Sequence, residues 1–267
     1  MRRFVIGDVH GCSKALRTLI ETIDPTPEDE VIFLGDYIDR GPDSKNVVDQ
    51  IIDLQSQCRV VALRGNHEIM LIAVALGGFD DTVWLKNGGR ATVSSYGGSL
   101  AKIPERHLAF YQDLQPYYES SDSIFVHAGY DPELDMEEQD DNIIYWRHLP
   151  NPLPPPHKSG KRVFVGHTPQ GGGAIMDGEH IVCIDTYCFG GGFLTAFEIE
   201  TNRVIQCDYH GHLRRMSRLN LSKPLAWLCK SAWSTARAAL TRSPATEQGS
   251  SKEPSPTVTV PGKTAEN

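Results

Sequence analysis

The sequence predicts an α/β fold, a sandwich in which two mixed β-sheets carry helices on their outer faces. Three observations lead to this prediction. Apolar runs at residues 4–6, 31–34 and 60–63 are each followed by a helix-like segment. Beyond about residue 118 the pattern becomes mainly strand-like. The chain has 267 residues, of which 40% are apolar, so it can bury a substantial core.

The elements follow one another in a simple order. Helices are expected near residues 13–23, 44–54 and 68–76, and Asp43 and Ser44 can cap the second of them. Between Gly77 and Tyr118 the composition changes to a Gly-rich, partly helical insert beside the mouth of the expected site. The strand-like runs that come after the insert lie at residues 123–126, 162–165, 180–184, 193–199 and 203–208.

Five short motifs place metal-ligand side chains at the ends of strand-like runs: residues 7–11 (GDVHG), 35–41 (GDYIDRG), 65–68 (GNHE), 127–129 (HAG) and 166–169 (GHTP). Turns of this kind line the crevice at the carboxyl ends of parallel strands. One such motif alone could be a helix cap or a turn. Together they supply oxygen and imidazole ligands that suit Mn²⁺, Fe²⁺ or Zn²⁺, namely Asp8, His10, Asp36, Asn66, His127 and His167.

In order, spacing and flanks, these motifs resemble those of the phosphoprotein phosphatase (PPP) family of metallophosphoesterases, and most closely its short bacterial and phage serine/threonine protein phosphatases. The resemblance covers roughly residues 2–208 and includes Trp146-Arg147 and Ile184-Asp185-Thr186. It implies a calcineurin-like architecture and two divalent metal ions, Mn²⁺ first and Fe or Zn as alternatives.

The resemblance also implies a role for each residue. Asp8 and His10 would hold the first ion, and Asn66, His127 and His167 the second. Asp36 would bridge them, because two cations about 3.5 to 4 Å apart need a short anion between them.

A hydroxide bridging the two ions would attack phosphorus directly. His67 would be the general acid, oriented by Asp39, and Arg40 and Arg147 would clamp the phosphate. Glu68 is interpreted as structural.

Two alternatives remain beside the predicted hydrolysis of phosphoprotein or phosphopeptide monoesters. One is a symmetrical dinucleotide polyphosphate hydrolase of the diadenosine tetraphosphatase kind. That group usually lacks the acid-orienting Asp and ends the third motif in Asp, whereas this chain has Asp39 and Glu68. The other is an inactive binding module. The run from Tyr187 to Phe189 departs from the PPP pattern, since small residues are expected there, and predicts a bulkier wall opposite the metals.

Composition divides the chain into a catalytic domain at 1–208, a basic amphipathic helical extension at 209–242 and a disordered tail at 243–267. Residues 209–267 hold nine Lys or Arg against three Asp or Glu, so the catalytic part is acidic and nucleic acid is not expected as a partner. Within 223–240 the apolar residues share one helical face, which predicts weak contact with a membrane surface or a partner.

The start of the chain and its cysteines predict a cytoplasmic protein. Only a few apolar residues follow Met1-Arg2-Arg3 before Asp8, so no signal peptide is expected. The six cysteines show neither zinc-finger spacing nor a Cys-x-x-Cys pair and are interpreted as reduced thiols.

Overall fold

The computed structural model describes residues 1–75 and 77–214. The predicted tail at 243–267, the segment 223–240 and most of the predicted extension at 209–242 lie outside the described residues. Within the described ranges, no helix combines the length and the apolar character that crossing a membrane would need.

The first sheet has five strands in the order β10-β9-β1-β2-β3. Strands β1, β2 and β3 run parallel, with β3 at one edge of the sheet. Strands β9 and β10 form an antiparallel hairpin beside β1. The strands are β1 (Arg3–Ile6), β2 (Glu30–Phe33), β3 (Arg59–Ala62), β9 (Phe193–Glu198) and β10 (Arg203–Asp208).

The second sheet also has five strands, in the order β4-β5-β6-β8-β7. The strands β5, β6 and β8 are parallel, while β4 and β7 are antiparallel at the two edges. The strands are β4 (Tyr117–Glu119), β5 (Ser123–Val126), β6 (Arg162–Val165), β7 (Met176–Asp177) and β8 (Ile181–Cys183). Both sheets are therefore mixed, as predicted.

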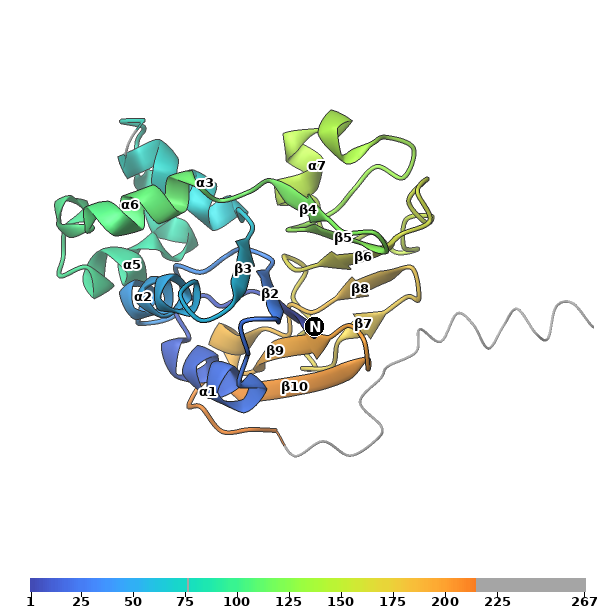
Figure 1. Ribbon diagram of the computed structural model, residues 1–267. Coiled ribbons are helices and arrows are strands. Elements are labelled where there is room, and N and C mark those ends of the chain that lie inside the picture. Colours follow the sequence, from blue (N-terminus) through green and yellow to red (C-terminus); the bar gives the residue numbers. More distant parts are fainter. Residues whose placement is uncertain (76, 215–267) are drawn as a thin grey trace, which may run out of the picture. The chain divides into compact units, whose positions relative to one another are not determined.

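The helices connect the strands and cover the outer faces (Figure 1). Asp43 caps α2, since its side chain accepts a hydrogen bond from the Asn46 N–H. The longer helices are α1 (Ser13–Ile23), α2 (Ser44–Leu54), α3 (Asn66–Ala75) and α6 (Glu105–Gln112), and the shorter are α4 (Thr82–Trp84), α5 (Arg90–Ser95) and α7 (Asp141–Trp146). Single turns are η1 (Leu85–Gly89), η2 (Leu100–Lys102), η3 (Met136–Glu138) and η4 (Cys188–Gly190).

Successive side chains of a strand point to opposite faces of its sheet, and the buried apolar side chains accordingly form three clusters between the helices and the sheets. Phe4, Ile6 and Phe33 face α1, α2 and the insert helices. Val5 and Ile32 point the other way and meet Phe125, Phe164 and Val182 of the second sheet. The outer face of the second sheet packs on α7. The layers are therefore helix, sheet, sheet and helix, which confirms the predicted fold class.

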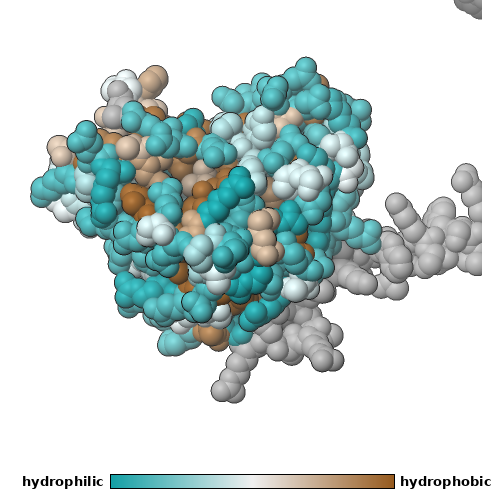
Figure 2. All heavy atoms as spheres, viewed as in Figure 1, coloured by the Kyte–Doolittle hydropathy of each residue, from teal (hydrophilic) through white to brown (hydrophobic). Residues whose placement is uncertain are grey.

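The short elements differ most from the sequence prediction. β4, β7 and α7 were not predicted, because two or three residues of strand and six of helix carry too little periodicity. In Figure 2 the surface is hollowed between the side that carries α3 and the side that carries α7, and apolar residues gather along part of this hollow.

Candidate metal centre

The predicted site residues lie where strands of both sheets end. Asp8 and His10 follow β1, Asp36 follows β2, and Asn66 opens α3 after β3. The turns are tight, because non-glycine residues there adopt left-handed backbone angles, with φ of 42° at His10 and 51° at Asp36. Asp39, Arg40 and His167 share this conformation, with φ of 71°, 65° and 58°. Strained backbone of this kind is typical of functional sites, where the surrounding fold holds the unfavourable angles in place.

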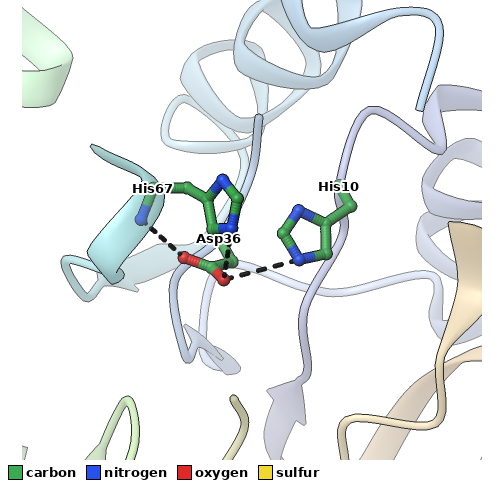
Figure 3. Close-up of side chains that lie close together, drawn as sticks. All are labelled: His10, Asp36 and His67. Atoms are coloured by element: carbon green, nitrogen blue, oxygen red, sulfur yellow. Dashed lines mark hydrogen bonds and ion pairs between the residues drawn. The ribbon is translucent and has the colours of Figure 1, made fainter. Parts of the chain in front are cut away.

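Asp36 lies at the middle of the cluster. Its Oδ2 atom is 3.4 Å from His10 Nε2 and 3.9 Å from His67 Nε2. Figure 3 draws both contacts as dashed lines. Its Oδ1 atom faces the other way and is 3.5 Å from His127 Nε2. One carboxylate thus meets two separate imidazole groups, and this arrangement fits the bridging role predicted for Asp36.

Backbone carbonyls set the tautomers of three histidines. His10 Nδ1 donates to the Ile38 carbonyl at 2.7 Å, and His127 Nδ1 donates to the Leu34 carbonyl at 2.8 Å. His167 uses its other nitrogen, Nε2, which donates to the Trp146 carbonyl at 3.1 Å. A carbonyl can only accept, so the proton of each neutral ring is placed there and the opposite nitrogen keeps its lone pair.

The lone pairs of His127 and His167 point at the same oxygen atom. Asn66 Oδ1 is 3.0 Å from His127 Nε2 and 3.1 Å from His167 Nδ1. Two acceptors at this distance repel each other unless a cation or a proton lies between them. The donor set is a carboxylate, an amide oxygen and imidazoles, which is suitable for a borderline divalent ion, and each ring is oriented by a second hydrogen bond as in metal centres.

The residues therefore fit two divalent ions. Side chains of His10, Asp36 and His67 form one compact group, and side chains of Asp36, His127 and His167 form the other. In the first group His10 and Asp36 are the predicted ligands, while His67, bonded to Asp39, is the predicted acid. When bound, such ions polarise phosphate oxygens and make water a strong nucleophile near neutral pH.

Asp8, predicted as a ligand of the first ion, lies beside these two groups. Its carboxylate accepts the backbone N–H of His167, at 3.2 Å from Oδ1 and 3.1 Å from Oδ2, and the side chain is outside both compact groups. It also lies against Asp185, a buried residue at the end of β8 that the sequence interpretation did not place in the site. The signal was present in the Ile184-Asp185-Thr186 match, but a lone Asp after a strand is usually a turn residue.

The buried carboxyl groups interact unfavourably with one another. Burial first, and then the charges of Asp185 and Asp36, raise the pKa of Asp8 well above its usual value. Burial also raises the pKa of Asp185 to about 6. Against burial, the neighbouring histidines lower the pKa of Asp36. Like charges at close range favour a protonated group or a bound cation, so this electrostatic environment also suits a metal centre.

His67 and Asp39 form a buried pair. His67 Nδ1 donates to Asp39 Oδ2 at 2.6 Å, and the two side chains are 1% and 0% exposed. Asp39 also accepts from Trp84 Nε1 at 2.8 Å and from Thr92 Oγ1 at 2.6 Å. Burial acts to lower the pKa of His67, but attraction to Asp36 and the bond to Asp39 outweigh it, so the pKa is raised. The pair therefore has the geometry expected for an oriented acid.

Trp84 and Thr92 come from the insert between α3 and β4, so the insert fixes the Asp39 turn. Sequence reasoning missed both residues, because no local motif links position 39 to positions 84 and 92.

Glu68 holds two of the strand-end turns together. Its buried carboxylate accepts the backbone N–H groups of Asp36 and Tyr37, each at 2.9 Å, and that of Gly65 at 3.0 Å. A side chain at Gly65 would collide with Asp36, so glycine is required at this point. These contacts are structural, in keeping with the interpretation of Glu68 from the sequence.

The two predicted arginines differ in their surroundings. Arg40 Nη1 is 3.0 Å from His10 Nε2, and its guanidinium carbon lies 4.8 Å from the centre of the Phe189 ring. Arg147 is exposed and follows Trp146, whose carbonyl contacts His167. Within the described ranges, Arg147 has no ion pair. Arg40 is therefore held against the cluster, while Arg147 lies at its edge.

The bulkier wall predicted at residues 187–189 is present. The Phe189 ring lies 4.9 Å from the His10 ring and 4.7 Å from the Tyr187 ring, edge to face in both cases. Tyr187 has a φ of 63°, a conformation that favours small residues.

The chain matches the calcineurin-like phosphoesterase family over residues 1–221. This match spans most of the sequence, and the chain belongs to that family. Its donor set fits the metal-dependent phosphoester chemistry for which the family is named.

Its relatives include symmetrical bis(5'-nucleosyl)-tetraphosphatases. That of Pectobacterium carotovorum subsp. carotovorum (strain PC1) is 31% identical over 141 residues, which are 51% of this chain and 46% of that protein. That of Janthinobacterium sp. (strain Marseille) is 37% identical over 135 residues, which are 50% of this chain and 45% of that protein. The chain thus spans about half the length of the curated relatives it matches.

Solved structures share the fold. A protein provisionally assigned as a diadenosine tetraphosphatase aligns with a TM-score of 0.59 and 21% identity, over 77% of this chain and 92% of that one. A cold-active protein-tyrosine phosphatase of Shewanella aligns with a TM-score of 0.56 and 17% identity, over 81% of this chain and 80% of that one.

The wider family predicted from the motifs is therefore confirmed. For the substrate, the names of the relatives favour the dinucleotide alternative over the protein phosphatase interpretation.

Proposed function

We propose that this member of the calcineurin-like phosphoesterase family hydrolyses phosphomonoesters of alcohols, with serine- and threonine-phosphorylated proteins or peptides as its substrate class. One observation carries the proposal, the buried His67–Asp39 pair with its 2.6 Å hydrogen bond. It distinguishes monoesters from anhydrides because the two substrate classes release leaving groups of very different basicity.

A serine or threonine alkoxide is about as basic as hydroxide, whose conjugate acid has a pKa of about 15.7. It departs readily only if an acid protonates it. A nucleotide released from a tetraphosphate ends in a phosphate group with a second pKa of about 6 and can depart without a proton. A buried, oriented acid therefore accelerates monoester cleavage more than anhydride cleavage, by roughly 10²- to 10⁴-fold.

Each residue of the site has a separate role in the proposed reaction. His67 presents Nε2 toward the centre and gives its proton to the departing oxygen. Asp39 holds the imidazole through Nδ1, and the insert holds Asp39 through Trp84 and Thr92. Arg40 presents guanidinium donors to the phosphate beside His10, and Arg147 supplies a second cation from the edge. Asp36, His10, Asn66, His127 and His167 would hold the two ions, with Asp8 beside them.

The second candidate is symmetrical hydrolysis of dinucleoside tetraphosphates. Two observations favour it, the names of the relatives and the similarity to a structure provisionally assigned to that activity. The alignments with the relatives cover only about half of each of those proteins, so the activity of the whole relatives is carried to this chain only as a proposal.

A substrate panel with metal-loaded protein separates the candidates. A phosphoserine peptide, an activated aryl phosphate and diadenosine tetraphosphate are compared by kcat/KM, for the unmodified chain and for His67→Asn. We expect the peptide to lose the most in the variant and the tetraphosphate the least. Preferred cleavage of the tetraphosphate by the unmodified chain, with little loss in the variant, would establish the second candidate. No turnover of any substrate would indicate an inactive binding module.

The cofactor and partner proposals follow from the same site. Two divalent ions per chain are expected, with Mn²⁺ the first to test, by metal analysis of the purified protein and reconstitution with single metals. Phosphoproteins are the proposed partners, and the acidic catalytic part disfavours nucleic acid. Contact of residues 223–240 with a membrane or a protein remains a prediction, tested by vesicle binding with and without that segment.

A further inference from the structure

A pocket of about 520 Å³ lies on the outer side of Arg40, and the proposed function does not use it. Three segments that are far apart in the sequence line it: the turn that follows β2, the turn between β8 and β9, and the end of β10. This volume lies in the range of pockets that bind small ligands. The pocket shares Arg40 with the metal centre, so the two sites adjoin.

Phe189 forms the wall on the side of the metal centre. Its ring is next to His10, at 4.9 Å, and next to the Arg40 guanidinium, at 4.8 Å. Arg40 in turn reaches His10 Nε2 at 3.0 Å. Arg40 and Phe189 thus border both the metal centre and the pocket, so a phosphate held by Arg40 would lie beside the pocket.

The rest of the lining offers rings and open space. Tyr209 and His210 lie on the β10 side, with their ring centres 5.3 Å apart. Gly191 has a φ of 97°, and a β-carbon at this position would meet no atom within 4 Å. Asp208 also lines the pocket, but its Oδ1 atom already accepts the N–H groups of His210 and His212, each at 2.9 Å. The pocket therefore offers flat surfaces more than an unengaged charge.

We propose that this pocket binds a flat aromatic group carried by the phosphorylated substrate. The inference rests on the phosphoesterase chemistry of the proposed function, because it needs the phosphate to occupy the metal centre beside Arg40, and it adds ring-bearing substrates to the serine and threonine phosphoesters proposed above. Aromatic side chains and the guanidinium plane of arginine both bind flat rings by stacking or edge contacts. The ring has two possible sources, the phenol of an aryl monoester such as phosphotyrosine and the base of a nucleotide.

Matched substrate pairs test the proposal with metal-loaded, full-length protein. One pair is a single peptide sequence carrying phosphotyrosine or phosphoserine. The other is diadenosine tetraphosphate and inorganic tetrapolyphosphate, which lacks the bases. We expect Phe189→Ala to lower kcat/KM for the ring-bearing member of a pair about 3- to 10-fold more than for the ringless member, the size expected for one aromatic contact. The pair that shows this difference identifies the source of the ring.

Three further variants separate stacking from a general disturbance of Arg40. Tyr209→Ala removes another ring of the lining. Among the described residues, the ring and hydrogen-bond contacts of Arg40 do not include Tyr209, so the same ring-specific loss is expected. Phe189→Trp should restore the preference. Phe79→Ala is the matched control, because Phe79 is 70% exposed and lies in the insert, away from the pocket lining.

Binding provides a readout that does not depend on turnover. Phenylphosphonate should bind the metal-loaded chain more tightly than methylphosphonate in calorimetry, and Phe189→Ala should remove most of the difference. If no substrate is hydrolysed, the proposed function fails, while this comparison still decides the pocket. Equal losses for both members of each pair, with equal binding of the two phosphonates, would overturn the inference.

Discussion

The two ends of the first sheet carry opposite arrangements of charge. At the amino end, arginines pair with carboxylates: Arg2 with Asp29 at 2.6 Å and Arg59 with Glu30 at 3.1 Å. Arg3 pairs with both Asp122 and Glu200, at 2.6 and 2.7 Å. At the carboxyl end, Asp8, Asp36 and Asp185 are buried together, and after burial itself the charges of Asp185 and Asp36 raise the pKa of Asp8.

The backbone differs in the same way. The strand ends at the metal centre adopt left-handed angles at His10 and Asp36, whereas the amino ends of β1 and β2 are ordinary parallel strand in register. The same strands thus gain stability at one end and hold an unfavourable cluster at the other. The comparison indicates that activity and stability can be changed separately, by substitutions at opposite ends of the same strands.

The largest effect is expected for Asp36→Asn, because Asp36 contacts both groups of ligands. Metal binding supplies several kcal/mol of charge stabilisation, so we expect turnover of an activated aryl phosphate to fall by about 10³-fold or more. Metal content should also fall. Thermal unfolding in a chelator should shift downward, because the histidines around Asp36 hold its folded pKa below the ordinary value and its ionised form therefore contributes stability at neutral pH. Full metal content with near-normal turnover would refute the bridging assignment.

The next effect concerns His67 and Asp39, which should act as one unit. His67→Asn should lower kcat on an alkyl phosphate by roughly 10²- to 10⁴-fold. Asp39→Asn should cost less, and the double variant should be little worse than His67→Asn alone. A double-mutant cycle on alkyl and activated aryl phosphates measures this. Additive losses, or equal losses on both substrates, would mean that the 2.6 Å contact does not serve proton transfer.

These two predictions concern residues that the sequence alone identified. The first-sheet motifs could be predicted because each is continuous in sequence: strand, turn and helix follow within about ten residues, as from Phe4 to Ser13. Short periodic segments of this kind carry their own structural signal. The fold class followed from the same alternation, and His67 was placed one residue from a predicted ligand.

The remaining parts of the site depend on contacts between distant segments. Trp84 and Thr92 reach Asp39 from positions 45 and 53 residues away in the sequence. Asp185 follows a strand of the second sheet and lies against Asp8, which follows a strand of the first. Phe189 likewise contacts Arg40 from a distant part of the sequence. No local pattern encodes such contacts in a single sequence. The substrate could not be derived for the same reason, because the pocket lining comes from three separate segments.

Asp185→Asn should have a smaller effect on activity and a positive effect on stability. The folded pKa of Asp185 is raised to about 6, above its unfolded value of about 3.9. The folded state therefore binds the extra proton between these values, and in chelator its stability falls as pH rises from about 4 to about 6. Above that range the full penalty remains, on the order of 1 to 3 kcal/mol.

Asparagine removes this penalty and can still accept the Tyr187 N–H that Asp185 Oδ1 accepts at 3.0 Å. In chelator at pH 7.5, the unfolding temperature should rise by at least about 2 °C, and the gain should shrink toward pH 4. With metal bound, kcat/KM should fall by less than about 10-fold, because Asp185 lies against Asp8 and is in neither of the two compact ligand groups. Calorimetry across this pH range, beside kinetics at pH 7.5, tests the prediction, and a pH-independent loss of stability would contradict it.

The smallest effect is expected at the amino end, for Asp29→Asn. The Asp29 carboxylate is 4% exposed and accepts hydrogen bonds from Arg2 and from Thr26. The bond from Arg2 is the main reason why its folded pKa lies below the ordinary value. Its stabilising contribution is therefore present above the unfolded pKa of about 3.9 and is lost as pH falls through the folded pKa.

Because Arg2 is 39% exposed, solvent screens the pair, and the loss in the variant should be about 1 kcal/mol, or about 2 to 4 °C in unfolding temperature at pH 7. The difference from the unmodified chain should shrink below pH 4. The kinetic constants should not change, because Asp29 lies at the end of the sheet opposite the metal centre. A matched loss of turnover in folded Asp29→Asn protein would mean that the two ends are coupled, and the separation of stability from activity would then fail at this position.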